Sequence, residues 1–368
     1  MKLLYVADNG FSFKKGAYYY SRPNEVNSSQ YKKYFDSICF IARRSEYSDK
    51  MLPIDGSCKV ELVGRYDIRD LKNAMTAMAT DYDAVIVRNG LFGCFAAKYA
   101  KKLGKVLISY CGADPFEFKM AEGTLSGKLM AYYLRCLEKR KLKLADYAHY
   151  CTQELFNRYP SQCPYLICSN VSIEVNQEIV DRRLKKIRQT NGIFKIGLIG
   201  QFRNNDNKGI STAIKALGLL GNKYQLEVVG EGGSDRYKDV ISNLHLVNQI
   251  VFLGYISDRE QLNAWLDDID IYVQPSLSEG LPRATIEAMS RGCPVIASNV
   301  CGLIDLLPDD YLINPKDYCT LAEKIKWLSN PEQTKKASEQ NYYKELEFRE
   351  DIRDKKLDDF FMKITKNS

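Results

Sequence analysis

Short apolar runs alternate with longer segments of helical periodicity along most of this chain, and that alternation constrains its fold more than any other feature. In the first half, the apolar runs that predict strands are residues 3–7, 37–42, 59–63, 84–87, 105–110, 147–151 and 165–168. Helical segments such as residues 71–79, 92–103 and 126–144 lie between them. Strands that alternate with helices favour a parallel sheet with helices on both faces.

The alternation stops between residues 170 and 192, a polar and charged segment that predicts a linker with some helix. It then restarts, with strands predicted at residues 195–199, 225–229, 250–253, 271–274 and 294–297. A chain of 368 residues is long enough for two domains. We therefore expect two doubly wound α/β domains, at 1–171 and 172–349, with a helix at about 350–368 that packs back onto the first. Ligands of such sheets bind at the carboxyl ends of the strands, and two facing domains would form a cleft.

Positive charge is concentrated in the first half of the chain. Up to residue 171 there are 26 Lys and Arg against 17 Asp and Glu, whereas the remainder holds 27 against 29. A basic half favours an anionic partner, which could be a membrane surface, a phosphate-bearing acceptor or nucleic acid; a contribution to solubility alone explains the charge equally well.

The eleven cysteines include no C-x-x-C pair, so we expect no metal site. Several lie in apolar runs, which indicates small buried side chains in a reducing compartment. The apolar run at residues 3–7 ends at Asp8 and predicts a first strand rather than a signal peptide. With no apolar stretch of about 18 residues, we expect a cytoplasmic protein that touches a membrane only peripherally.

The segment from Pro275 to Ser290 carries the clearest chemistry. It follows the predicted strand 271–274, so Glu279 and Gly280 lie in a loop at a strand's carboxyl end. Pro282 suits the first turn of a helix that Gly292 ends. The amide groups at such a helix start attract a diphosphate, and two glutamates beside an anion make sense if they bind hydroxyl groups. The alternative is a strand, turn and helix with two surface glutamates.

This segment resembles the donor-site signature of glycosyltransferases with the GT-B fold, in particular glycosyltransferase family 4. The resemblance extends to residues 292–298, 200–209, 229–232 and 252–256, and so covers most of the chain from about 194 to 307. The first domain matches only in its general layout.

The resemblance implies a role for each matching residue. Arg203 and Lys208 would hold the donor diphosphate, Glu279 the donor sugar and Glu287 the ribose. Further donor-binding positions would be Gly200, Gly230, Glu231, Tyr255, Ile256, Gly280, Leu281 and Pro282. The resemblance also implies that the reaction retains the anomeric configuration and needs neither metal nor cofactor. It implies two partners: a UDP-, GDP- or dTDP-sugar as donor, and a glycan or lipid-linked acceptor. It implies no binding of nucleic acid.

The first domain departs from the family in places. Relatives have a Gly-rich loop after the first strand, and here residues 8–16 take that place, with Gly16 as the candidate for close approach to the donor. Residues 18–20 and the Ser/Asn-rich stretch after them predict a long early loop. Cys111 stands where many relatives have a histidine, and Asp114 is a candidate for orienting the acceptor or, alternatively, for capping a turn.

Four basic residues of the predicted helix 126–144 follow a helical spacing: Lys128, Arg135, Lys139 and Lys143. They predict one basic face, with Leu125, Leu129 and Leu144 elsewhere, that either contacts anionic lipid or is simply solvated.

Other functions are less consistent with these motifs. A dinucleotide oxidoreductase requires Gly-x-Gly-x-x-Gly, which neither residues 197–200 nor 230–233 supply. The remaining alternatives are a related GT-B epimerase or phosphorylase, and a non-catalytic partner that binds nucleotide sugars. The favoured function is sugar transfer to a hydroxyl group in the synthesis of a bacterial surface polysaccharide or lipid-linked glycan.

Overall fold

A computed structural model describes residues 1–21, 28–64, 67–169, 171, 173, 176–187, 192–200 and 206–366, except the side chains of Asp8 and Asn9. The chain forms two compact units. Unit 1 consists of Met1–Asn170 with Arg353–Ser368, and unit 2 of Val171–Ile352.

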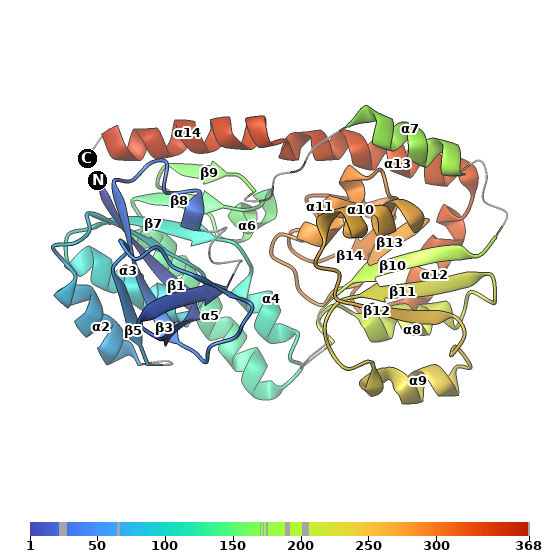
Figure 1. The fold of residues 1–368 in the computed structure, drawn as a ribbon, viewed down its shortest axis with the longest axis horizontal. Helices are drawn as coiled ribbons and strands as arrows, with labels where there is room; N and C mark the ends of the chain where they lie inside the picture. The colour runs from blue at the N-terminus through green and yellow to red at the C-terminus, as the bar shows by residue number, and fades with distance from the viewer. Residues whose placement is uncertain are drawn as a thin grey trace. The chain divides into compact units, whose positions relative to one another are not determined.

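Unit 1 is built on a parallel sheet (Figure 1). The parallel strands run in the order β5 (Val60–Val63), β3 (Ser37–Arg44), β1 (Lys2–Lys14), β6 (Ala84–Val87), β7 (Val106–Cys111), β8 (Tyr147–Tyr150) and β9 (Tyr165–Ile167). All four residues of β6 are buried, which fits a central strand covered on both faces. The helices are α2 (Ile68–Ala77), α3 (Leu91–Lys102), α4 (Pro115–Met120), α5 (Leu125–Leu144) and α6 (Gln153–Arg158).

The last helix, α14 (Glu350–Lys366), packs on unit 1. Its Phe361 ring stacks on Tyr34 at 5.1 Å between centroids. Asp358 pairs with Lys33 at 2.6 Å and accepts a hydrogen bond from the Tyr34 hydroxyl. The end of the chain thus completes the core of the unit that its beginning forms.

The loop expected around residues 8–20 is instead a β-hairpin. Strand β1 continues to Lys14 and pairs antiparallel with β2 (Ala17–Ser21), which also pairs with β4 (Met51–Pro53). Buried Phe11 of β1 and Tyr20 of β2 meet edge to face at 5.6 Å, and aromatic residues favour strands. Lys15 and Gly16 both have positive φ, at 48° and 82°, as a two-residue hairpin turn requires.

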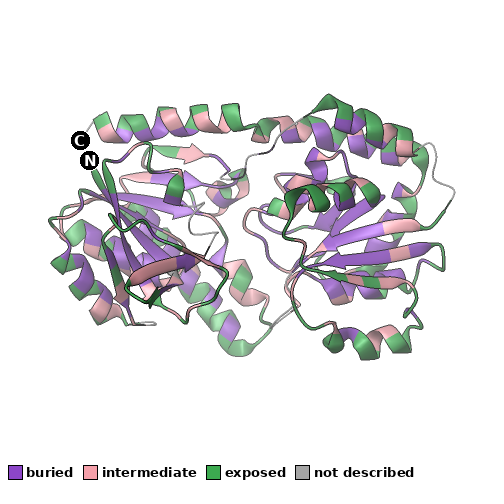
Figure 2. Cartoon of the chain, viewed as in Figure 1, coloured by how far each residue is buried: buried purple, intermediate pink, exposed green. Residues whose placement is uncertain are grey.

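Unit 2 is a second doubly wound domain, with the parallel strand order β12-β11-β10-β13-β14-β15 (Figure 1). The strands are β10 (Phe194–Ile199), β11 (Tyr224–Val229), β12 (Ile250–Gly254), β13 (Ile271–Gln274), β14 (Val295–Ser298) and β15 (Leu312–Ile313). The helices are α7 (Gln177–Ile187), α8 (Ile210–Leu217), α9 (Lys238–Asn243), α10 (Arg259–Asp268), α11 (Arg283–Ser290), α12 (Tyr318–Leu328) and α13 (Pro331–Glu345). Figure 2 shows the buried strands at the centre of each unit. The predicted fold class is confirmed.

Helix α7 occupies much of the predicted linker and packs against α13. Its buried Arg183 donates to the carbonyl oxygens of Leu266 and Ile269, and Lys186 donates to Asp268. Two cations thus cover the carbonyl end of α10, where the helix dipole favours positive charge.

Candidate functional site

Glu279 lies at the centre of a hydrogen-bonded cluster at the carboxyl end of β13. Its side chain is 7% exposed, and its Oε1 accepts from Lys208 Nζ at 2.6 Å, Ser276 Oγ at 2.7 Å and Gln274 Nε2 at 3.1 Å. Lys208 comes from another loop, which leads from β10 into α8. The structure therefore brings together Lys208 and Glu279, two candidates from separate motifs for which the sequence predicted no direct contact.

A second row of polar side chains supports this cluster from within the sheet. The Tyr272 hydroxyl donates to Gln274 Oε1 at 2.5 Å and accepts from Ile199 N at 3.3 Å, and Gln274 Nε2 also donates to Ser276 Oγ at 2.7 Å. Burial raises the pKa of Tyr272 well above its usual value, so the phenol remains a donor. The sequence analysis missed these residues, although a glutamine that ends the apolar strand 271–274 is a usable signal.

Two glycines allow the surrounding loops to approach each other. A Cβ at Gly209, whose φ is +71°, would lie 1.9 Å from the Pro275 carbonyl oxygen. A Cβ at Gly230, with φ +151°, would lie 1.7 Å from the Gly200 carbonyl oxygen. Only glycine fits such contacts, so the β10, β11 and β13 loops are held in one arrangement at the carboxyl edge of the sheet.

Helix α11 begins directly after this cluster. The helix runs from Arg283, so Pro282 is the residue directly before it. The sequence analysis had placed Pro282 within the first turn. No side chain of the described residues caps this end, and Gly280 and Leu281 are half-buried in front of it. Arg283 N donates to the Leu281 carbonyl oxygen at 3.0 Å, whereas no described residue accepts from the amides of Ala284 and Thr285, which are therefore available to an anion. The helix ends at Ser290, and Gly292 follows with φ +62°.

The remaining donor-binding candidates of unit 2 lie on neighbouring elements. Glu287 Oε1, on α11, accepts from Arg259 at the start of α10 at 2.6 Å. Tyr255 is 63% exposed after β12, Ile256 packs against the core, and Glu231 is half-buried after β11. Arg203 lies outside the described residues.

The candidates in unit 1 have local roles in the structure. Gly16 lies in the exposed hairpin turn. Buried Asp114 caps α4 through Phe116 N, accepts from the Tyr159 hydroxyl at 2.6 Å and pairs with Arg158 at 2.8 Å. Its two oxygens are thus used in holding α4 to α6.

Cys111 and a buried ion pair lie near the carboxyl end of β7. Burial raises the pKa of the Cys111 thiol to about 12, so the thiol is protonated near neutral pH. Glu138 and Lys141 of α5 form a fully buried ion pair that the sequence analysis did not predict. Asn89 donates to Glu138 and accepts from Gly112 N at 2.6 Å, so this pair supports the loop after β7.

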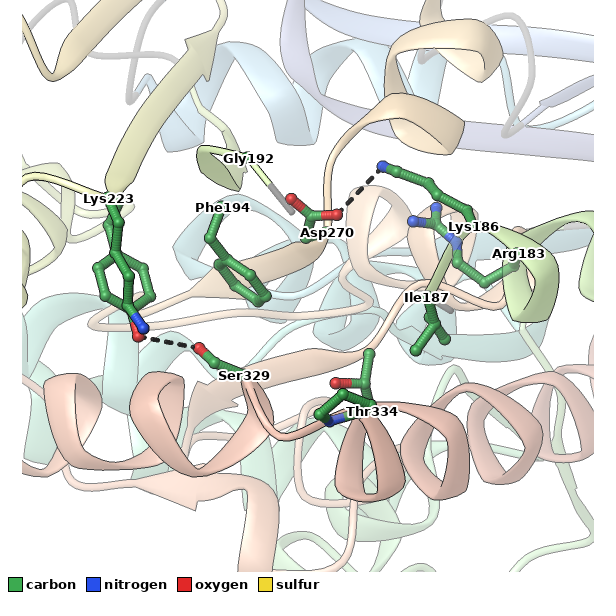
Figure 3. Close-up of a pocket in the computed structure, with 11 residues that line it drawn as sticks. Arg183, Lys186, Ile187, Gly192, Phe194, Lys223, Asp270, Ser329 and Thr334 are labelled. Carbon is green, nitrogen blue, oxygen red and sulfur yellow. Dashed lines mark hydrogen bonds and ion pairs between the residues drawn. The ribbon is translucent and has the colours of Figure 1, made fainter. Parts of the chain in front are cut away.

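A separate pocket lies at the opposite edge of the unit 2 sheet (Figure 3). Phe194 and Tyr224, which line it, are the first residues of β10 and β11. Two of its three cations, Arg183 and Lys186, are already bonded to the end of α10. The pocket is therefore at the amino ends of the strands, away from the edge where such sheets bind ligands.

Within the described ranges, no group of three or more His, Cys, Asp and Glu side chains is arranged to hold a metal ion. Of the helices described, none combines the length and apolar character needed to cross a membrane.

Comparisons with known proteins point to one family. Residues 183–345 match the model of the family described as Glycosyl transferases group 1. Protein CapJ of Staphylococcus aureus is 34% identical over 257 residues, which cover 68% of this chain and 64% of CapJ. The capsular polysaccharide biosynthesis glycosyltransferase CapM of the same species is 27% identical over 165 residues, covering 43% of this chain and 42% of CapM. The matched regions thus span less than two thirds of either relative.

The fold has a counterpart among solved structures. The structure of HepE from Anabaena in complex with UDP-glucose superposes with a TM-score of 0.67 at 18% identity, covering 100% of both chains. Over residues 183–345 this chain is therefore similar to the group 1 glycosyltransferases, and each of its two units is a Rossmann-like domain, as in proteins of the GT-B fold.

Proposed function

We propose that this protein transfers a sugar from a nucleoside-diphosphate sugar to a hydroxyl group of a glycan or lipid-linked acceptor, in the synthesis of a surface polysaccharide. The observation that carries the proposal is the Lys208–Glu279 cluster beside the start of α11, at the carboxyl edge of the unit 2 sheet. The family match supports the reaction class, and the similarity to CapM, a glycosyltransferase of capsular polysaccharide biosynthesis, supports the pathway type.

The cluster has the chemistry that the donor requires. The Lys208 ammonium and the first-turn amides of α11 would face the diphosphate and stabilise negative charge as it leaves the sugar. The three hydrogen bonds that the described residues make to the Glu279 side chain all go to Oε1, so Oε2 would accept from a sugar hydroxyl. Glu287 would accept from the ribose hydroxyls, and Arg203 would add a second cation.

We further propose retention of anomeric configuration without a metal. Lys208 and the helix start would supply the positive charge that a metal ion provides elsewhere. The acceptor hydroxyl would attack on the face that the diphosphate leaves, with the diphosphate oxygen taking its proton. Cys111, buried and protonated, would take no part in this step.

Binding of the donor is tested first. Melting temperatures are measured with UDP-, GDP- and dTDP-sugars, UDP-glucose being the first choice because HepE was crystallised with it. We expect one class of nucleotide sugar to stabilise the protein. If none does, the proposed function fails.

Transfer is tested next, with slow donor hydrolysis as the assay that needs no acceptor. Glu279→Gln is expected to lower turnover with little effect on nucleotide binding, whereas Glu323→Gln, at an exposed position of α12, leaves both unchanged. Donor binding without hydrolysis or transfer to any acceptor would favour the non-catalytic alternative. The anomeric signal of the product in NMR, and activity in the presence of EDTA, test retention and metal independence.

A further inference from the structure

Helix α5 of unit 1 exposes apolar side chains on the side that faces away from the sheet. Its buried side is formed by Gly127, Ala131, Leu134, Glu138, Lys141 and Leu142. On the opposite side, Leu125 is 76% exposed, Leu129 67%, Tyr132 58% and Tyr133 48%. Figure 2 shows exposed residues along this helix. A helix packed on a domain normally turns polar side chains outward, so this surface departs from the usual pattern.

The same side of α5 is strongly basic. Lys128, Lys139, Arg140 and Lys143 are exposed, and the only acidic residue of the helix, Glu138, is buried. With about 3.6 residues per turn, the apolar residues cover the first half of the outward side and the cations most of the second half. We call this surface the α5 outer face: Leu125, Lys128, Leu129, Tyr132, Tyr133, Lys139, Arg140 and Lys143.

This arrangement corrects the face predicted from the sequence. Leu125 and Leu129 do not lie elsewhere on the helix but share the outward side with the lysines. Arg135 is half-buried, with its guanidinium 5.0 Å from the Phe116 ring, and so belongs to the packing of α4 on α5.

We propose that the α5 outer face docks on the surface of an anionic lipid bilayer. Leucine side chains would enter the boundary between headgroups and acyl chains, and the tyrosine rings, apolar with a polar end, suit the same depth. The four cations would contact lipid phosphates, each contributing to attraction near the surface. The helix would lie on the membrane while its other side remains packed on unit 1.

Charge distinguishes this partner from a second copy of the chain. A twofold dimer through this face would bring eight cations, four from each copy, into one interface with no carboxylate from α5 among them. A small soluble phosphate would account for the cations but not for the exposed leucines and tyrosines.

The full-length protein is tested by flotation with vesicles of phosphatidylcholine, either pure or mixed with phosphatidylglycerol. We expect binding to the mixed vesicles that weakens as salt is added. Lys139→Glu with Lys143→Glu should lower the partition coefficient by about 30-fold or more, since each basic residue near the surface contributes about fivefold. Leu125→Ser with Leu129→Ser should lower the partition coefficient at high salt as well, because salt does not screen the apolar contribution.

A matched pair on α3 provides the control. Lys98→Glu with Lys102→Glu makes the same charge change, with the same spacing, on exposed residues of another helix of unit 1. This variant should bind mixed vesicles nearly as well as the parent, and melting curves of all variants should match.

Two outcomes would overturn the proposal. One is equal loss of vesicle binding in the α3 and α5 variants, or no preference of the parent for phosphatidylglycerol. The other is a dimer, measured by light scattering, that dissociates in the leucine variant while the parent does not bind vesicles. Neither outcome bears on donor binding, so the proposed function would be unaffected.

Discussion

Alanine in place of Lys208 removes the cation that lies 2.6 Å from Glu279 Oε1. If that cation also contacts the donor diphosphate, its loss removes a charge-assisted hydrogen bond of about 1.5–3 kcal/mol. We therefore expect the nucleotide Kd to rise by about 10- to 150-fold. Isothermal titration calorimetry with the nucleotide that stabilises the parent measures this change.

The same substitution also affects the free protein. Glu279 is 7% exposed and would lose its charged partner, but it would keep Ser276 and Gln274 as donors. Because Lys208 is 31% exposed, the loss should fall below that of a fully buried pair, at about 1–2 kcal/mol. The melting temperature of unit 2 should therefore fall by several degrees.

A double variant separates the two effects. Lys208→Ala combined with Glu279→Gln removes the unpaired charge and keeps an amide oxygen as acceptor for Ser276 and Gln274, so stability should recover while nucleotide binding remains weak. Lys215→Ala removes an exposed cation from α8 and should leave binding unchanged. Binding that recovers in the double variant would mean that Lys208 only neutralises Glu279, and unchanged binding in Lys208→Ala would refute the diphosphate contact.

Three further predictions concern stability and reactivity. Burial lowers the pKa of His149 from 6.5 to about 4. Between these pH values the unfolded chain therefore binds more protons than the folded protein, and lowering the pH through this range should decrease the free energy of unfolding by about 3 kcal/mol. His149→Gln, which retains a donor for the Cys168 carbonyl that His149 Nε2 contacts, should flatten that dependence in urea titrations, and an unchanged slope would contradict the assignment. Cys111, with its raised pKa and buried side chain, should resist iodoacetamide in the native protein while exposed Cys136 reacts, as mass spectrometry would detect. Gly230→Ala should cost at least about 2 kcal/mol, because its Cβ would overlap the Gly200 carbonyl, whereas Gly221→Ala, with positive φ but open space, should cost about 1 kcal/mol; equal losses in urea unfolding would show that overlap is not the cause.

The sequence predicted the fold class because both sheets consist of short apolar strands separated by amphipathic helices. It missed the hairpin of β1 and β2. There the resemblance suggested a Gly-rich loop, whereas Phe11 and Phe13 lie on β1 and Tyr18 and Tyr20 on its antiparallel partner β2. The turn at Lys15 and Gly16 requires a positive φ at both residues. Residues other than glycine rarely adopt a positive φ, so Lys15 gives no signal for this turn in the sequence.

The candidate site was partly predictable for a similar reason. Glu279 and Lys208 stand in motifs, but their direct contact depends on how two loops pack through Gly209 and Pro275. Nothing in the sequence around Asp114 shows whether its carboxylate caps a helix and forms an ion pair or instead contacts the acceptor. That distinction depends on Arg158, 44 residues further along the chain.

Helix α7 has a practical consequence for the dissection of this protein. A fragment that began at β10, where the second series of strands starts, would lack Arg183 and Lys186 and leave the carbonyl end of α10 facing water. The family match begins at residue 183, within this helix. A fragment of unit 2 for isolated expression should therefore start ahead of Gln177 and include the whole of α7.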